Sequence, residues 1–215
     1  MNVFAIVPVK TLANSKKRLT PILSGRERAK LSEALLLDVL NAVCNSGVTK
    51  VIVVSMDQMV IKIAREFGAV IVKEKRECGV NSAVALTDSI CRDGDASIVI
   101  PQDLPFILSS DIDMMCRSAT SKRCVVITPS HRYDGTNALL RKPSNAIQTH
   151  YDEDSYEIHV SKARKENLPV KIFLNNRLML DIDEPKDITY VMKSNYVSKA
   201  KDYLLEIRHK LKPCL

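Results

Sequence analysis

The chain has 215 residues, of which 46% are hydrophobic and 27% are charged, a composition that suits one compact domain and excludes a disordered chain. Its net charge of +7 could serve nucleic acid or small anions, but only 5% of the residues are aromatic and Trp is absent, which disfavours nucleic acid as a partner. The sequence has no apolar run long enough to cross a membrane and no basic leader with a cleavage site, so we expect a cytoplasmic protein.

Short apolar runs rich in Val and Ile alternate with stretches of helical periodicity along the first 130 residues. The runs predict strands at 3–9, 51–55, 69–72, 97–101 and 125–129. Between them the periodicity predicts helices near 25–46, 58–67, 80–91 and 109–119. This alternation is typical of the α/β class, with a mainly parallel central sheet and helices on both faces.

The pattern is less regular after residue 130. A turn at 133–135 leads into the apolar residues 138–140. The residues that follow predict a helix near 155–166 and a short strand at 170–174.

The sequence from Pro185 to the end of the chain predicts helical structure. Pro185 suits the first turn of a helix, for which Asp183 is the candidate N-cap. A later apolar stripe is formed by Tyr203, Leu204 and Ile207. Because the sequence has no repeat or linker, we expect one domain over residues 1–190, with residues 191–215 as a C-terminal helical extension of the same domain.

The loop after the first predicted strand carries four cations in nine positions, Lys10, Lys16, Lys17 and Arg18. It contains neither a G-x-G-x-x-G nor a Walker A sequence, so the usual dinucleotide and P-loop sites are not indicated. Open parallel sheets bind ligands beyond the carboxyl ends of their strands, and cations placed there can neutralise a triphosphate or a leaving pyrophosphate. Charge alone does not separate this role from that of a solvated loop.

Asp103 follows the predicted strand at 97–101 and stands between Pro101 and Pro105. A carboxylate at the carboxyl end of a strand suits magnesium, which takes one or two carboxylates together with phosphate oxygens. The two prolines restrict the local backbone and so fix the direction of Asp103. The alternative is an Asp that serves only as a turn or N-cap residue.

A second group of acids lies at 180–187. Asp181 and Asp183 alternate on an extended segment and so share one face, where one of them could complete a metal site begun by Asp103. Asp187 falls in the first turn of the next predicted helix, where an acid offsets the helix dipole. We therefore interpret Asp187 as structural.

Two smaller polar patterns remain. Asn81 and Ser82 open a predicted helix after Gly79 and could face a nucleotide or act as a plain N-cap. The turn at 134–137 offers hydroxyl and amide donors to a carboxylate or phosphate, or is an ordinary turn. His131, His150 and His159 have no partner that the sequence identifies.

Five segments, in this order, resemble the 2-phospho-L-lactate guanylyltransferases, which make a precursor of the deazaflavin coenzyme F-420. They are VPVKTLANSKKRL at 7–19, NSAVAL at 81–86, IPQDLPFI at 100–107, DGTNALL at 134–140 and LDIDEPKDI at 180–188. The broader sugar and molybdopterin nucleotidyltransferases usually carry glycines in the first loop, whereas Lys-Thr-Leu-Ala here is similar to the phospholactate branch. The resemblance implies a single-domain nucleotidyltransferase fold of the glycosyltransferase-A-like type, with a mixed sheet.

The resemblance also implies roles for individual residues. Those expected to be catalytic are Lys10, Lys17, Arg18 and Asp103, with the three cations on phosphates. Those expected to bind the nucleotide are Lys10, Asn81, Ser82 and Asp103. Asp103 and Asp183 are expected to hold Mg²⁺, with Asp181 as a further candidate. Thr136 and Ser155 are expected to bind the small phosphoacid.

One segment departs from the family pattern. The family usually has a glycine-bearing segment before the serine, whereas this chain has Asp152, Glu153 and Asp154 before Ser155. Acids at this place would repel an anionic substrate unless they point away or meet Lys or Arg.

The resemblance implies a homodimeric enzyme that condenses GTP with 2-phospho-L-lactate or phosphoenolpyruvate and releases pyrophosphate. The partners would thus be GTP and a small phosphorylated carboxylic acid. Two alternatives stay open on the residues alone. One is a related nucleotidyltransferase with another acceptor, such as a sugar phosphate, molybdopterin or phosphoglycerate. The other is a non-catalytic protein that binds nucleotide or RNA.

Overall fold

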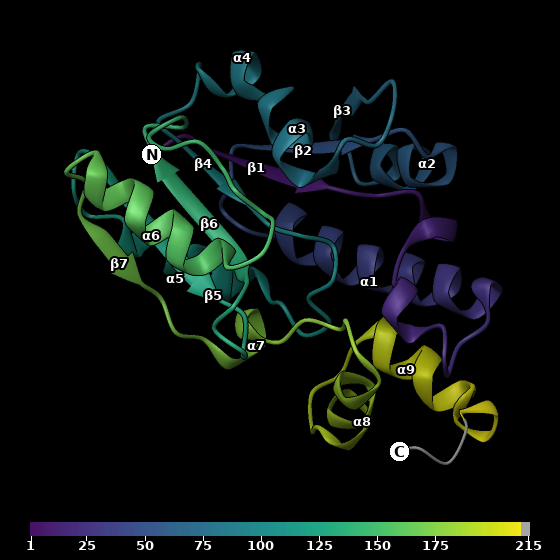
Figure 1. The fold of residues 1–215 in the computed structure, drawn as a ribbon. Helices are drawn as coiled ribbons and strands as arrows, with labels where there is room; N and C mark the ends of the chain where they lie inside the picture. Colours follow the sequence, from purple (N-terminus) through teal and green to yellow (C-terminus); the bar gives the residue numbers. More distant parts are fainter. Residues whose placement is uncertain (212–215) are drawn as a thin grey trace.

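The computed structural model describes residues 1–211, which form a seven-stranded mixed sheet between layers of helices (Figure 1). The strands are β1 (Val3–Pro8), β2 (Lys50–Ser55), β3 (Val70–Lys73), β4 (Ala96–Val99), β5 (Cys124–Pro129), β6 (Thr136–Lys142) and β7 (Val170–Ile172), in the order β3-β2-β1-β4-β6-β5-β7. The pairs β1–β2, β1–β4, β2–β3 and β5–β7 are parallel, and β6 runs antiparallel to both β4 and β5. The expected mainly parallel α/β sheet is confirmed.

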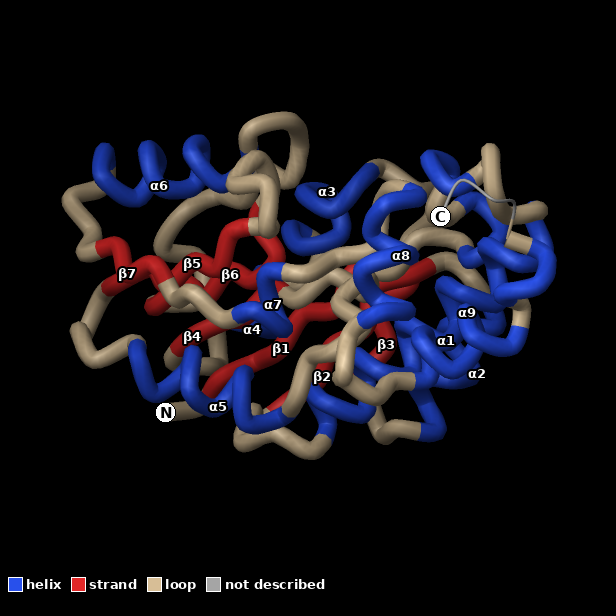
Figure 2. The backbone as a smooth tube through the Cα atoms, turned by 90° about the horizontal axis from the view of Figure 1, so that it is seen from below, coloured by secondary structure: helices blue, strands red, loops and turns tan. Residues whose placement is uncertain are grey.

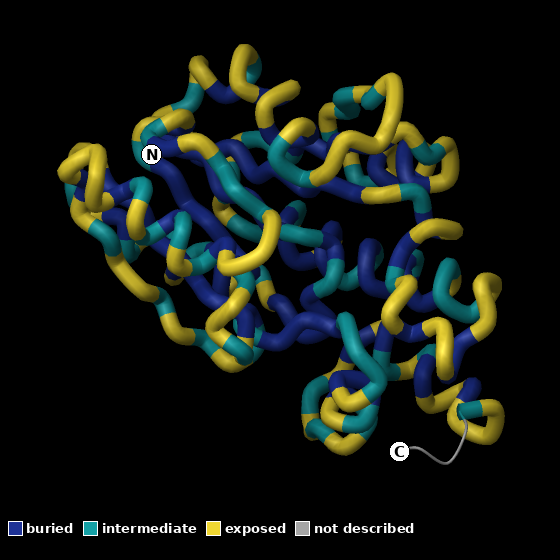
Figure 3. Tube along the Cα trace, viewed as in Figure 1, coloured by how far each residue is buried: buried dark blue, intermediate teal, exposed yellow. Residues whose placement is uncertain are grey.

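Helices cover both faces of this sheet. They are α1 (Gly25–Cys44), α2 (Gln58–Glu66), α3 (Gly79–Ala85), α4 (Asp88–Cys91), α5 (Ser109–Ser118), α6 (Ser155–Lys165), α7 (Asn176–Met179), α8 (Pro185–Lys193) and α9 (Lys199–Glu206), with short 3-10 turns at Leu12–Asn14, Lys17–Leu19 and Arg208–Lys210. Alternate residues of β1 show why two layers form: Ala5 and Val7 pack under α1 and α2, while Phe4 and Ile6 face α3. Figure 2 shows α3 and α6 on one side of the strands and α5 on the other. The strands between these layers are largely buried (Figure 3).

Local sequence explains where several helices begin and end. The predicted capping box at the start of α1 is present, with Ser24 accepting the N–H of Glu27 and Glu27 accepting that of Ser24. The single helix predicted at 80–91 is instead divided into α3 and α4. At this break the Thr87 hydroxyl donates to the carbonyl of Val84 at 2.7 Å, a local bond that competes with a continuous helix.

Strand β6 is the element that the sequence pattern missed. Its central residues 138–140 are apolar, but its direction follows from pairing with β4 and β5 and not from any local signal. Because β6 is antiparallel to β4, it starts at the edge of the sheet where β1, β2 and β4 end. Thr136, its first residue, therefore lies on the same edge as the loop that carries Asp103.

The C-terminal helices α8 and α9, at the lower right of Figure 1, form a third apolar cluster with α1. Leu204 of α9 and Ile207, the residue after this helix, are buried in the cluster, and Asp38 of α1 accepts the N–H groups of Lys199 and Ala200 at 2.9 Å. The stripe predicted at Tyr203, Leu204 and Ile207 thus packs largely within the chain. The predicted continuous helix is interrupted between Lys193 and Lys199, and its last residues, 212–215, lie outside the described part.

The sequence suggested Asp183 as the N-cap of α8, and this prediction is wrong. The N-cap is Glu184, because the Asp187 carboxylate accepts the N–H of Glu184 at 2.7 Å and that of Asp183 at 2.9 Å. The structural role expected for Asp187 agrees with these bonds, and the side chain of Asp183 remains available for other contacts. None of the helices within residues 1–211 is long and apolar enough to cross a membrane.

Candidate functional site

A cleft of about 1250 Å³ lies at the edge of the sheet where the parallel strands end. Pockets for one small ligand usually measure roughly 300–1,000 Å³, so this cleft has room for two. The cations that line it are Lys10, Lys16, Lys17, Arg18 and Arg132. The acids that line it are Glu77, Asp103, Asp134, Asp152, Glu153, Asp154, Asp181 and Asp183. Cationic and acidic side chains from distant segments thus share one cavity.

Two acids that are far apart in the sequence meet on Lys16. Its ammonium nitrogen lies 2.9 Å from an oxygen of Asp103 and 3.0 Å from an oxygen of Asp183. The Lys16 side chain is only 5% exposed. Burial lowers the pKa of Lys16, but the two carboxylates more than offset this and raise it above its ordinary value, so Lys16 stays charged.

Among the loop cations, Lys17 and not Lys16 was expected to be catalytic. Lys17 and Arg18 are exposed on the rim of the cleft, and Arg18 approaches Asp183 at 3.7 Å. Lys10 is also exposed at the rim. Lys16 precedes the 3-10 turn Lys17–Leu19 and has a backbone φ of 54°, in the left-handed region, a conformation that no local pattern in the sequence indicates.

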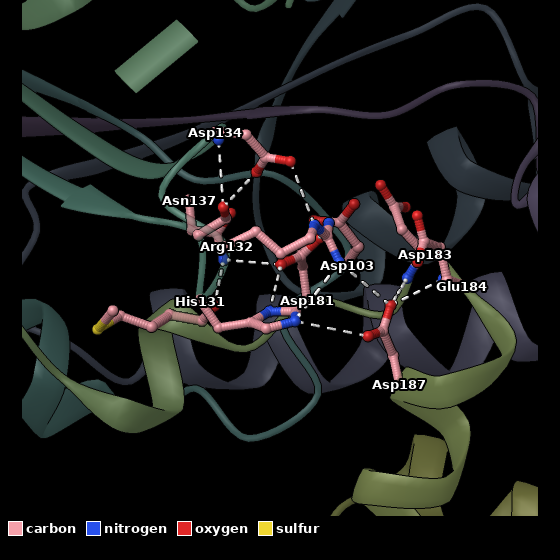
Figure 4. Close-up of polar contacts among 12 residues, drawn as sticks. Asp103, His131, Arg132, Asp134, Asn137, Asp181, Asp183, Glu184 and Asp187 are labelled. Carbon is pink, nitrogen blue, oxygen red and sulfur yellow. Dashed lines mark hydrogen bonds and ion pairs between the residues drawn. The ribbon is translucent and has the colours of Figure 1, made fainter. Parts of the chain in front are cut away.

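Asp181 faces the same cleft but has different partners. Its carboxylate accepts from Arg132 at 3.1 Å and from the Asn137 amide at 3.2 Å (Figure 4). Burial, together with the charges of Asp103 and Asp183, raises the pKa of Asp181 to about 6. Asp181 and Asp183 therefore share a face of their segment, as predicted, while Asp183 and not Asp181 contacts Lys16.

Arg132 was not singled out by the sequence. It lies at hydrogen-bond or ion-pair distance from Asp134, Asp181 and Asp187, so it joins the loop after β5 to the segment before α8 (Figure 4). Its acidic partners raise the pKa of Arg132 against the opposing effect of burial. Because Asp181 and Asp187 come from a distant segment, no local pattern identifies them as partners of Arg132.

The residues fit a magnesium site made from two carboxylates. Within residues 1–211, no three His, Cys, Asp or Glu side chains are grouped as a complete set of metal ligands. Asp103 and Asp183 do converge on one cationic nitrogen, however, and magnesium commonly takes one or two carboxylates with the rest of its shell from water and phosphate. The pair therefore suits a metal that arrives with a phosphorylated ligand.

Thr136 and Ser155, the residues expected at the acceptor, both line the cleft and are both buried. Thr136 begins β6, and Ser155 begins α6, so the positive end of that helix faces the cleft at Ser155. The Thr136 hydroxyl oxygen lies 3.0 Å from Nδ1 of the buried His159. Thr136 and Ser155 thus line the same cleft as the cationic loop.

Asn81 and Ser82 do not line the cleft directly. The Asn81 amide donates to Asp152 at 3.0 Å, and its oxygen accepts the N–H of Tyr151 at 2.7 Å. Ser82 is exposed. Asn81 therefore supports the loop before α6, and its predicted contact with a nucleotide has no counterpart among these bonds.

The acids at 152–154 line the cleft. Asp152 is held by Asn81, while Asp154 has a backbone φ of 54°, in the left-handed region that favours glycine. This backbone explains why a glycine is the expected residue before Ser155. Asp is among the few other residues that tolerate the conformation.

His159 should make the stability of the protein depend on pH. Burial lowers the pKa of His159 from 6.5 to about 3, so the folded protein binds this proton less tightly than the unfolded chain. Its contribution is therefore fully present above pH 6.5 and decreases as the pH falls towards 3. Between pH 7 and pH 5, the wild type should lose about 2 kcal/mol more free energy of unfolding than His159→Asn, measured with urea. Equal losses in the two proteins would show that His159 titrates normally.

Comparisons with known proteins agree with this geometry. Residues 3–214 match the family described as "Guanylyl transferase CofC like". The chain is 32% identical to the 2-phospho-L-lactate guanylyltransferase of Methanothermobacter thermautotrophicus, over 99% of this chain and 94% of that protein. It is 34% identical to the phosphoenolpyruvate guanylyltransferase of Roseiflexus castenholzii, over 89% of this chain and 88% of that protein.

Solved structures share the fold at low sequence identity. A Desulfovibrio desulfuricans protein described as a nucleotide-diphospho-sugar transferase superposes with a TM-score of 0.78 at 14% identity, covering 98% of this chain and 97% of its own. A cytidylyltransferase from Leptospira borgpetersenii gives 0.61 at 15% identity, covering 100% and 98%. The expected nucleotidyltransferase fold is thereby confirmed.

Proposed function

The chain belongs to the family of CofC-like guanylyl transferases and is a nucleotidyltransferase, and on this premise we propose that it joins GTP to 2-phospho-L-lactate or phosphoenolpyruvate. The observation that carries the proposal is the meeting of Asp103 and Asp183 on the buried Lys16, in the lining of a cleft that contains further cations. A cleft with several cations is suited to bind ligands that carry several negative charges. A nucleoside triphosphate and a small phosphorylated acid are ligands of this kind.

The reaction is a single displacement at phosphorus. An oxygen of the acceptor's phosphate attacks the α-phosphorus of GTP, the bond from that phosphorus to the β-bridging oxygen breaks, and pyrophosphate leaves with the electron pair. The second pKa of a phosphomonoester is near 6, so the attacking oxygen is largely ionised at neutral pH and no proton has to be removed. The protein must therefore position two anions that repel each other and neutralise charge on the leaving group.

Different residues of the cleft lining would bind the two ligands. Lys10, Lys17 and Arg18 on the rim would contact the triphosphate, and Lys16 would exchange an acid for a phosphate oxygen when the nucleotide enters. Elsewhere in the lining, Thr136 and the start of α6 at Ser155 would bind the phosphoacid.

Magnesium is the proposed metal, held by Asp103 and Asp183, with Asp181 as a further candidate. When bound, it would neutralise phosphate oxygens of the nucleotide. Asp103 is held in place by the backbone as well, because its carbonyl accepts the N–H of Ile182 at 3.2 Å. That bond joins the two metal-binding segments directly.

We also propose that the protein acts as a homodimer, as the resemblance implies. The buried face of α9 is not the contact surface, since it packs against α1. Exposed apolar side chains nearby include Tyr190 and Val197, which are 57% and 83% exposed. Light scattering should give twice the mass of one chain, and Val197→Asp should lower it if this surface is the contact.

Pyrophosphate release with GTP, magnesium and a panel of phosphoacids tests the proposed reaction. Turnover with phospholactate or phosphoenolpyruvate is the expected result. Turnover only with a sugar phosphate, molybdopterin or phosphoglycerate would assign a different acceptor. Absence of turnover with every acceptor, despite GTP binding, would contradict the proposal.

Asp154→Gly should both stabilise the protein and strengthen acceptor binding. Glycine relieves the left-handed backbone, which is worth about 1 kcal/mol, and the change removes a negative charge from the cleft. We expect a higher melting temperature and a KM for the phosphoacid lowered severalfold, with the KM for GTP changed less.

Asn167→Gly is the matched control. Asn167 has a φ of 52°, follows α6 at its far end and is not part of the cleft lining. The Asn167→Gly variant should raise the melting temperature to a similar extent and leave the KM values for GTP and for the phosphoacid unchanged. If Asp154→Gly leaves the acceptor KM unchanged as well, the acid at 154 does not face the acceptor.

A further inference from the structure

His159 is a buried side chain that the reaction described above does not use. It lies one turn after Ser155 on α6 and is 0% exposed. Its Nε2 accepts the backbone N–H of His150 at 2.8 Å, and its Nδ1 lies 3.0 Å from the Thr136 hydroxyl oxygen. The ring therefore connects two parts of the wall at which the acceptor is expected.

The contact with His150 fixes where the ring carries its proton. A neutral imidazole has one N–H and one lone pair, and a backbone amide can only donate. Nε2 must therefore hold the lone pair, and Nδ1 must hold the hydrogen. Burial lowers the pKa of His159 to about 3, so the ring does not gain a second proton near neutral pH.

The tautomer of His159 in turn decides what Thr136 can do. Because Nδ1 carries the hydrogen, the Thr136 oxygen accepts from it and must direct its own hydrogen elsewhere. In the part of the chain that the structure describes, no protein acceptor for that hydrogen is found, and Thr136 lines the cleft. A hydroxyl held in this way offers a donor to a ligand.

We propose that His159 is a positioning residue that makes the Thr136 hydroxyl a fixed hydrogen-bond donor to an anionic oxygen of the acceptor. The class of ligand, a small phosphorylated acid, rests on the proposed function, whereas the tautomer does not. A hydrogen bond to a charged group contributes about 1.5–3 kcal/mol, which corresponds to roughly a tenfold to hundredfold change in affinity. The donor thus favours an oxyanion over a ligand group that can only donate.

Two substitutions separate the contacts of the ring. The side-chain nitrogen of Asn reaches about as far as Nδ1, so His159→Asn can still donate to Thr136 but gives up the bond to His150. The longer side chain of Gln reaches towards Nε2, so His159→Gln can still accept from His150 but gives up the donor to Thr136. Thr136→Val removes the hydroxyl while keeping its shape.

Binding of phosphoenolpyruvate and of GTP to each variant, measured by calorimetry, tests the proposal. His159→Gln and Thr136→Val should each weaken phosphoenolpyruvate binding about tenfold or more and leave GTP binding within about twofold. His159→Asn should stay within about threefold of the wild type for both ligands. The double variant His159→Gln/Thr136→Val should bind no more weakly than either single variant, because both changes remove one interaction.

Several results would overturn the proposal. They are equal losses for His159→Asn and His159→Gln, additive losses in the double variant, or a parallel loss of GTP binding, each of which indicates a general structural role. Long-range proton–nitrogen NMR of the ligand-free protein should show hydrogen on Nδ1 of His159, and hydrogen on Nε2 would also refute it. Wild-type protein that binds phosphoenolpyruvate without turnover would count against the proposed reaction alone, whereas failure to bind it would overturn the ligand assigned here.

Discussion

Asp103→Asn should lower turnover roughly a thousandfold while the protein stays folded. Asp103 is one of the two carboxylates that converge on Lys16, and an amide in its place removes a charged ligand from the proposed metal site. Loss of a few kcal/mol of charge stabilisation in the transition state corresponds to a factor of about this size. Initial rates of pyrophosphate release at saturating GTP and magnesium measure the effect.

Asp187→Asn is the matched control for this change. Asp187 lies four residues after Asp183, but its carboxylate accepts the N–H groups of Asp183 and Glu184 at the start of α8, which an amide oxygen can also do. We expect activity within about threefold of the wild type. Near-normal turnover of Asp103→Asn, or a large loss of turnover in Asp187→Asn, would show that the metal ligand has been assigned to the wrong acid.

Lys16→Met should have the second largest effect, with turnover lowered about a hundredfold. The Lys16 ammonium is buried and already positioned between two acids, so it does not need to be ordered when a nucleotide arrives. In the absence of metal, the variant should also melt at a lower temperature, because Asp103 and Asp183 lose their common counterion. Added magnesium should therefore raise its melting temperature more than that of the wild type.

Lys17→Met is the control for this change, because it removes the same charge from an exposed side chain next to Lys16. It therefore separates the effect of a buried, positioned cation from the effect of charge alone. The interaction of Lys17 with a ligand is screened by solvent, so we expect less than about a tenfold loss of turnover and little change in melting temperature. A severe loss in Lys17→Met, with Lys16→Met close to the wild type, would instead support the assignment made from the sequence.

Much of the fold could be predicted because its signals are local. Runs of Val and Ile marked β1, β2 and β5, and Ser24 with Glu27 marked the start of α1. Asp103 could be found for the same reason, since it lies in the short loop after the strongly apolar strand β4. Such features depend only on a few neighbouring residues.

The features that sequence reasoning missed depend on pairing between distant segments. Strand β6 is defined by its two antiparallel neighbours, and only this pairing places Thr136 beside the loop of Asp103. Arg132 gains its role from acids about 50 residues later, and His159 from His150 and Thr136. The choice of Asp183 as N-cap failed because Asp187 binds two backbone N–H groups at once.

We expect Asp103 and Asp183 to bind one divalent cation together with the nucleotide. Electron paramagnetic resonance with Mn²⁺ in place of magnesium, in the presence of a non-hydrolysable GTP analogue, tests it most directly. We predict tight binding to the wild type, at least tenfold weaker binding to Asp103→Asn and to Asp183→Asn, and unchanged binding to Asp187→Asn. Manganese affinity that stays the same in both Asp103→Asn and Asp183→Asn would show that these two acids do not hold the metal.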